Sequence, residues 1–148
     1  MHERVSDLLN RSRVLIYIAP SASVRETVEV MDRHNVGSVL IMDDHHKLCG
    51  IFTERDLVKR VVASGADPDE TPISDVMTPE VVVVDAATPA DTVFELMNQR
   101  KCRHIPVADG DRILGVVSLR DLLQRDRKIK EMEISQMRTY FLDAGYPG

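Results

Sequence analysis

The stretch GIFTERDL at residues 50–57 returns as GVVSLRDL at residues 115–122. Glycine, a hydroxyl residue, arginine, aspartate and leucine recur in register between the two stretches. Self-similarity at a fixed spacing indicates that one structural unit has been duplicated. The sequence therefore predicts two copies of a single small fold.

The repeat extends outward from this stretch in both directions. The matching segments are residues 22–31 with 88–97, residues 39–41 with 105–107, and the lead-in VSDLL at residues 5–9 with ISDVM at residues 73–77. The spacing changes by one residue at a polar turn, where a change of length costs little. That turn comprises residues 43–47 in the first copy and residues 109–111 in the second. Two copies therefore cover nearly the whole chain.

The apolar residues change their period in the same order in each copy. Runs of β-branched residues at 16–18 and 81–84 are typical of short buried strands. The apolar residues that follow recur at the spacing of one helix face. That face comprises Val24, Val28 and Met31 in the first copy, and Ala90, Val93, Phe94 and Met97 in the second.

Local signals predict where the elements begin and turn. Ser23 with Glu26 resembles a capping box, and Thr88 before Pro89 is typical of an N-cap followed by proline at the first helical position. Apolar strands around each polar turn predict hairpins, residues 38–42 with 48–52 and residues 105–108 with 113–117. A second helix is expected to begin at Thr53 or Ser118, with an inner face formed by Leu57, Val58, Val61 and Val62, or by Leu122 and Leu123.

Each copy is thus strand, helix, strand, strand, helix, and the fold class is α+β. A unit of about 60 residues buries too little surface to be stable alone. The two copies are therefore expected to pack together about a pseudo-twofold axis, joined by a polar linker that Gly and Pro interrupt at residues 63–72. The predicted division is a first repeat at residues 5–65, a second at residues 73–128, and a C-terminal helical tail at residues 129–148.

Composition narrows the class of protein. The 148 residues contain 19 Lys and Arg against 24 Asp and Glu, a formal charge of -5, which argues against a nucleic-acid partner. Aromatic residues make up only 4% and there is no Trp, so an aromatic binding platform is disfavoured.

No window approaches the roughly 18 apolar residues of a membrane span, and no basic-apolar leader opens the chain, so we expect a cytoplasmic protein without a membrane partner. Cys49 and Cys102 lie in apolar segments and are expected to be buried, reduced thiols.

These repeats resemble a tandem pair of CBS domains, the modules named after cystathionine beta-synthase, over about residues 5 to 128. The resemblance rests on Gly-hydrophobic-hydrophobic-[Ser/Thr]-x-x-Asp at residues 50–56 and 115–121, on MTP at residues 77–79, and on RHIPV at residues 103–107. The first copy departs from this pattern, with VGSVL at residues 36–40 and NRS at residues 10–12.

The resemblance implies two clefts between the repeats that bind adenosine-containing ligands such as AMP, ADP or ATP, with no cofactor or metal required. One carboxylate can accept hydrogen bonds from both ribose hydroxyls, which is the expected role of Asp56 and Asp121, while Thr53 and Ser118 meet a phosphate or ribose oxygen at a helix N-terminus. The candidate cations for phosphate are Arg55, Arg103, His104 and Arg120. The candidate adenine slot is formed by Ile16, Tyr17, Leu40, Val82, Val83, Ile105 and Pro106.

Each of these residues also has a structural interpretation. Ser/Thr followed three residues later by Asp is an ordinary helix cap, and Arg55 and Arg120 fit a solvated helix face equally well. His45 and His46 beside Asp43 are expected to form a solvated hairpin turn rather than a metal site, because the second copy has no histidine there.

Three functional hypotheses remain open on the sequence. The first is a non-catalytic nucleotide sensor that acts through a homodimer or an unidentified protein target. The second is a constitutive structural module with empty clefts. The third is a small hydrolase or redox protein using His104 with Cys102, although no GxGxxG, GxxxxGK[ST], HExxH or GxSxG motif occurs.

Overall fold

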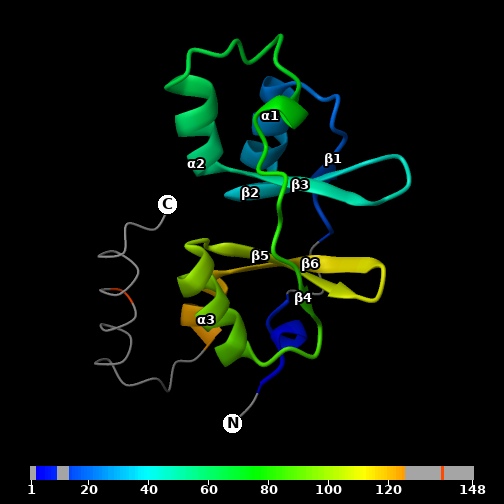
Figure 1. The fold of residues 1–148 in the computed structure, drawn as a ribbon, viewed down its shortest axis with the longest axis vertical. Coiled ribbons are helices and arrows are strands. Elements are labelled where there is room, and N and C mark those ends of the chain that lie inside the picture. Colours follow the sequence, from blue (N-terminus) through cyan, green and yellow to red (C-terminus); the bar gives the residue numbers. More distant parts are fainter. Residues whose placement is uncertain (1–2, 10–13, 126–137, 139–148) are drawn as a thin grey trace. The chain divides into compact units, whose positions relative to one another are not determined.

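The computed structural model describes residues 3–9, 14–125 and 138 (Figure 1). These residues fall into two compact units, one within residues 16–81 and the other formed by residues before 16 and after 81. None of the helices in the described part of the chain is long and apolar enough to span a bilayer. Each unit contains both helices and a sheet, which confirms the predicted α+β class. The predicted tail at residues 129–148 lies outside the described residues except for residue 138.

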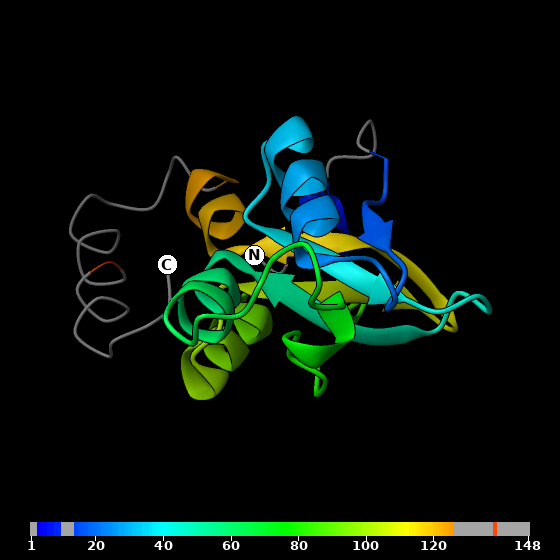
Figure 2. The ribbon, with the colours of Figure 1, turned by 90° about the horizontal axis from the view of Figure 1, so that it is seen from above.

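The unit within residues 16–81 is built on a three-stranded sheet in the order β1-β2-β3. Strand β1 runs parallel to β2, and β2 runs antiparallel to β3 in the predicted hairpin, with Ser38 opposite Thr53. Its elements are β1 (Tyr17–Ile18), α1 (Val24–His34), β2 (Ser38–Met42), β3 (Leu48–Thr53), α2 (Glu54–Asp56), the π-helical η2 (Leu57–Val62) and the 3₁₀ turn η3 (Ile73–Asp75). The β2–β3 turn extends away from α1 and α2 in both views (Figures 1 and 2).

Successive side chains along β2 point to opposite faces of the sheet, so its apolar residues are divided between the two faces. The helix-facing side forms a core of Val24, Met31, Val39, Ile41, Phe52, Val61, Ile73 and Val76. Ser23 caps α1 as predicted, because its Oγ accepts the Glu26 backbone N–H at 3.0 Å. The predicted face of α1 is also confirmed, because Val24 and Met31 lie in this core and Val28 packs against it. This face holds α1 against the sheet.

The other unit repeats this plan with a sheet in the order β4-β5-β6, again parallel and then antiparallel. Its elements are the 3₁₀ turn η1 (Val5–Leu8), β4 (Val84–Asp85), α3 (Ala90–Arg100), β5 (His104–Asp109), β6 (Arg112–Ser118) and α4 (Leu119–Arg125). Its core comprises Val5, Val84, Ala90, Val93, Met97, Ile105, Val107, Val117, Leu119 and Leu122. Gly110 turns the β5–β6 hairpin with a φ of +61°, which favours glycine.

The lead-in of each repeat belongs to the unit that contains the other repeat's sheet. In one unit the Ile73 N–H donates to the Ala22 carbonyl at 2.7 Å, and in the other the Val5 N–H donates to the Thr88 carbonyl at 2.7 Å. These two bonds occupy equivalent positions in the repeat. Sequence repeats and compact units therefore divide the chain at different places.

The same lead-ins also explain why α3 begins one residue later than predicted. Thr88 was expected at the N-cap, but Pro89 occupies that position and its side chain offers no cap. Because the Thr88 carbonyl already accepts the Val5 N–H, the chain turns into the helix only at Ala90. The Ala90 N–H donates to the Glu3 carbonyl at 2.8 Å, so the lead-in backbone replaces the predicted side-chain cap.

Two further predictions about the elements are wrong in detail. Val58 and Val62 do not lie on an inner helix face, since they are 60% and 70% exposed. The helix after Asp56 widens into the π-helical η2, whose wider turn buries Val61 and turns its neighbours outward. The strand expected at residues 81–84 is limited to Val84 and Asp85, the residues that pair with β5.

Candidate functional site

Thr53 and Asp56 form a reciprocal cap at the junction of β3 and α2. The Thr53 backbone N–H donates to Asp56 Oδ2 at 3.0 Å, and the Asp56 N–H donates to Thr53 Oγ1 at 3.3 Å. The Thr53 hydroxyl also lies 3.3 Å from Asp56 Oδ2. Asp56 is only 6% exposed, so the carboxylate depends on these partners for its stability.

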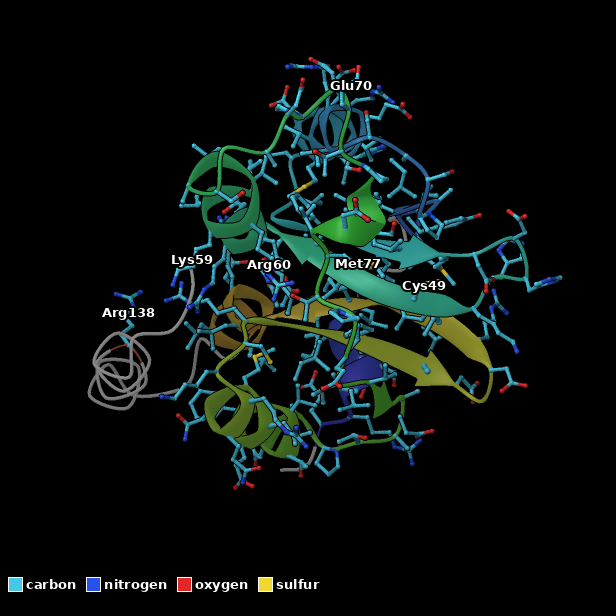
Figure 3. All side chains as sticks on the ribbon, turned by 45° about the horizontal axis from the view of Figure 1, so that its top comes forward. Cys49, Lys59, Arg60, Glu70, Met77 and Arg138 are labelled. Atoms are coloured by element: carbon cyan, nitrogen blue, oxygen red, sulfur yellow. The ribbon has the colours of Figure 1, made fainter. Side chains whose placement is uncertain are left out.

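Two residues that the sequence prediction omitted complete the surroundings of Asp56. The Thr78 hydroxyl donates to the carboxylate at 3.2 and 3.3 Å, and Arg60 Nε lies 3.5 Å from Oδ1. Arg60 Nη1 also donates to the Met77 carbonyl at 2.8 Å (Figure 3). Thr78 lies in the MTP motif and Arg60 lies four residues after Asp56, and these were the signals that could have identified both.

Ser118 and Asp121 form the equivalent cap at the junction of β6 and α4. The Ser118 N–H donates to Asp121 Oδ2 at 2.8 Å, and the Asp121 N–H donates to Ser118 Oγ at 3.0 Å. Within the described residues, Asp121 Oδ1 accepts no hydrogen bond. Both oxygens of Asp56 are engaged, whereas the described residues donate a hydrogen bond to only one oxygen of Asp121.

Arg103 and His104 lie beside the Ser118–Asp121 cap. His104 is paired with Ser118 across β5 and β6, and the Arg103 carbonyl accepts the Leu119 N–H at 2.8 Å. Burial lowers the pKa of His104 below 6.5, while the charge of Asp121 acts to raise it and that of Arg103 to lower it. The charges of Asp121 and Arg103 thus both act on the His104 imidazole.

The lowered pKa of His104 predicts an acid-sensitive contribution to stability. Above about pH 6.5 the imidazole is neutral in the folded and the unfolded chain. As the pH falls below 6.5, the unfolded chain takes up the proton first, so the folded state loses stability. Urea unfolding at pH 7.5 and 5.5 should show a larger loss for the wild type than for His104→Gln. An equal loss in both proteins would contradict this prediction.

The predicted adenine-slot residues differ in exposure and in the face that they occupy. Ile105 is fully buried in the core with Val93 and Met97, so its side chain packs within the unit. Because successive side chains of a strand point to opposite faces, Pro106 lies on the face of its sheet opposite to that of Ile105. Leu40 holds the equivalent place in the other unit. Ile16 packs against the core of its own unit, Val82 is half-buried, and Tyr17 and Val83 are 44% and 41% exposed.

The remaining candidate cations and the histidine turn are solvent-facing to different degrees. Arg55 is half-buried and Arg120 is exposed, and neither forms an ion pair with another described residue.

In the β2–β3 turn, the Asp43 carboxylate accepts the backbone N–H groups of His45 and Lys47, and the bond from Lys47 contributes most to lowering the pKa of Asp43. This network is that of a solvated turn. Across the described ranges, no group of three or more His, Cys, Asp or Glu residues is placed to hold a metal ion.

The two cysteines are free and half-buried, less enclosed than predicted. Burial raises the pKa of the Cys102 thiol, and the nearby charge of Arg100 only partly offsets this effect. A thiol with a raised pKa is a poor nucleophile near neutral pH. The raised pKa therefore argues against Cys102 as the nucleophile of a hydrolase or redox protein.

A family model described as "CBS domain" matches this chain twice, over residues 5–63 and residues 73–128. The chain is 36% identical over 121 residues to arabinose 5-phosphate isomerase of Escherichia coli (strain K12), a match that covers 82% of this chain and 37% of the isomerase. It thus spans little more than a third of that relative's length.

Solved structures give the same family. A CBS-domain containing protein from Agrobacterium tumefaciens is 34% identical, with a TM-score of 0.76 over 84% of this chain and 93% of that chain. The hexameric CBS-CP12 protein from bloom-forming cyanobacteria is 28% identical, with a TM-score of 0.76 over 83% of this chain and 67% of that chain.

Proposed function

Because this chain belongs to the CBS-domain family, with two copies matched in tandem, we propose that it is a non-catalytic regulatory module that binds adenosine-containing nucleotides. CBS domains commonly bind adenosine ligands, and pairs of them are typically regulatory. The observation that carries the proposal is the half-buried Asp121, whose Oδ2 is held by the Ser118 N–H while Oδ1 is without a partner among the described residues. An ionised carboxylate in that state can accept both hydroxyls of a ribose.

The second copy is the stronger binder in this proposal. Among the described residues Asp121 accepts only the Ser118 N–H, and it lies beside His104 and Arg103, whereas Asp56 already receives hydrogen bonds from Thr53 and Thr78. A ligand at Asp56 would have to displace one of these donors. This supports the alternative function, a purely structural module, for the first copy in particular.

A thermal-shift panel tests both functions. We expect AMP, ADP or ATP to stabilise the purified protein, by roughly 2.7 kcal/mol at about 100 times Kd, with NADH and S-adenosylmethionine as further adenosine compounds and GTP as the control. Asp121→Asn preserves the side-chain shape but removes the charge, and it should abolish most of the shift. The matched variant Asp56→Asn should retain most of it.

The outcomes separate the two functions. A larger loss for Asp56→Asn than for Asp121→Asn would reverse the ranking of the copies. A flat panel, with mass spectrometry showing no nucleotide carried through purification, would contradict the sensor function and favour the structural module.

We also propose that the chain self-associates and transmits its signal through this contact or through a protein target. Val58 and Val62 are four residues apart on η2 and are 60% and 70% exposed, an apolar pair that a second copy would bury. The related cyanobacterial protein is hexameric. Sedimentation velocity at micromolar concentration should show a dimer or larger species, and Val62→Lys should shift it toward monomer. A wild-type monomer would contradict this proposal.

A further inference from the structure

The carboxylate of Asp56 is bound by a residue from outside its own cap. The Thr78 hydroxyl donates to both carboxylate oxygens, at 3.2 Å to Oδ1 and 3.3 Å to Oδ2. Without this hydroxyl, Oδ1 would keep only Arg60 Nε, 3.5 Å away, among the described residues. Thr53 would still donate to Oδ2 from its backbone N–H and its hydroxyl. Thr78 thus occupies the part of the carboxylate that the cap leaves unused.

The backbone position of Thr78 does not depend on this hydroxyl. The Thr78 N–H donates to the Ile51 carbonyl at 2.8 Å, and the Thr78 carbonyl accepts the Ile51 N–H at 3.0 Å. The neighbouring Met77 carbonyl accepts a hydrogen bond from Arg60 Nη1 at 2.8 Å. A half-buried threonine held in this way can still turn between staggered rotamers. The side chain can therefore release Asp56 while the chain keeps its path along β3.

The Thr78 hydroxyl has the same chemistry as a ribose hydroxyl. Both are neutral O–H donors to an ionised carboxylate, so a ligand diol at Asp56 competes with Thr78 for the same lone pairs. The internal donor is tethered beside its acceptor, whereas a ligand must be captured from solution. When only a fraction of the molecules is competent to bind, the apparent affinity falls by that fraction. The contact between Thr78 and Asp56 is thus expected to weaken binding at the first copy.

We propose that Thr78 is an autoinhibitory residue of the first copy. Its hydroxyl occupies the Asp56 carboxylate, and a nucleotide binds there only after this side chain has turned away. The inference rests on the proposed function, in which the carboxylate accepts ribose hydroxyls. The ordinary alternative is that Thr78 only satisfies a carboxylate that is 6% exposed, as buried polar groups require. The two differ when the hydroxyl is removed, because only an autoinhibitory hydroxyl lowers the affinity for the ligand.

Removal of the hydroxyl in a chain with a disabled second copy tests the proposal. Asp121→Asn provides this parent, because its second carboxylate has lost its charge. In this parent, Thr78→Val keeps the β-branched shape and removes the hydroxyl, while Thr78→Ser keeps the hydroxyl as the matched control. Isothermal titration calorimetry of the full chain with AMP gives the Kd of each variant. Urea unfolding shows whether each variant folds, and Thr78→Ala replaces Thr78→Val if the valine variant does not.

We expect Thr78→Val to bind AMP about tenfold more tightly than its parent, the effect of removing one competing hydrogen bond to a charged group, and Thr78→Ser to stay within about twofold. Adding Asp56→Asn to Thr78→Val should remove the gain, which locates it at the first carboxylate. An unchanged or weaker affinity for Thr78→Val would show that autoinhibition is wrong, although the second copy of the wild type still binds. If the wild type binds none of AMP, ADP and ATP, the proposed function itself is wrong and this inference falls with it.

Discussion

Asp56→Ala is expected to destabilise the nucleotide-free chain by about 2–4 kcal/mol, a large fraction of the stability of a typical domain. The carboxylate is 6% exposed and accepts from the Thr53 backbone N–H and the Thr78 hydroxyl. Alanine would leave the Thr53 and Thr78 donors without this acceptor in a buried place. The ion pair with Arg60 contributes little, because the Arg60 side chain is 48% exposed.

Asp121→Ala is the matched control for this change. It removes the same residue from the same motif, but Asp121 is half-buried and accepts only the Ser118 N–H among the described residues. We expect the free energy of unfolding to fall by about 1 kcal/mol, a loss typical of removing a helix cap. Urea unfolding followed by circular dichroism measures both variants. Equal losses would show that burial and the Thr78 contact add nothing to the first cap.

The second large effect is expected for Gly50→Ala. Overpacking should lower the free energy of unfolding by about 2–3 kcal/mol. An added Cβ would lie 2.6 Å from Met77 Sδ and 2.7 Å from the Thr78 carbonyl oxygen. The Met77 side chain can move, but Thr78 is held against β3 by two backbone bonds with Ile51, of 3.0 and 2.8 Å. Relief of the clash therefore requires displacement of the Thr78 backbone.

Gly115→Ala provides the comparison, because Gly115 holds the equivalent place in the second motif. There the added Cβ would meet the end of the Leu9 side chain, with the nearest carbon, Cδ2, at 3.3 Å. A flexible leucine can move by a few tenths of an ångström, so we expect a loss of less than about 1 kcal/mol. Thermal melts of both variants give the comparison. If Gly115→Ala were as damaging as Gly50→Ala, close approach of the Thr78 backbone would not be the reason for the glycine.

Both predictions concern the segment that follows η3. Thr78 pairs with Ile51 through its backbone and with Asp56 through its hydroxyl, so changes at Gly50 and at Asp56 act on one contact region. The two substitutions are therefore expected to be non-additive. A ligand that takes the Asp56 carboxylate would act on the same segment.

The local features of this protein could be predicted from the sequence. The order of elements, the hairpins, the Ser23 cap and both Ser/Thr-x-x-Asp caps depend on residues that lie a few positions apart. Their periodicity and spacing are visible in the chain itself, and the duplication reinforced each of them. The family resemblance, now confirmed, rested on the same local motifs.

Other features required the tertiary structure, because they depend on contacts between distant residues. Thr78 reaches Asp56 across 22 positions, and the Glu3 carbonyl meets α3 at Ala90. The MTP motif marks Thr78 but not its partner, and no local pattern indicates the contact between Glu3 and Ala90 or the burial of Arg103 Nε. The sequence by itself determined the two repeats and their caps, since capping and hydrophobic periodicity are short-range. Only the tertiary structure decided which lead-in belongs to which sheet and that Thr78 completes the hydrogen bonding of Asp56, since both depend on hydrogen bonds between segments that the chain brings together on folding.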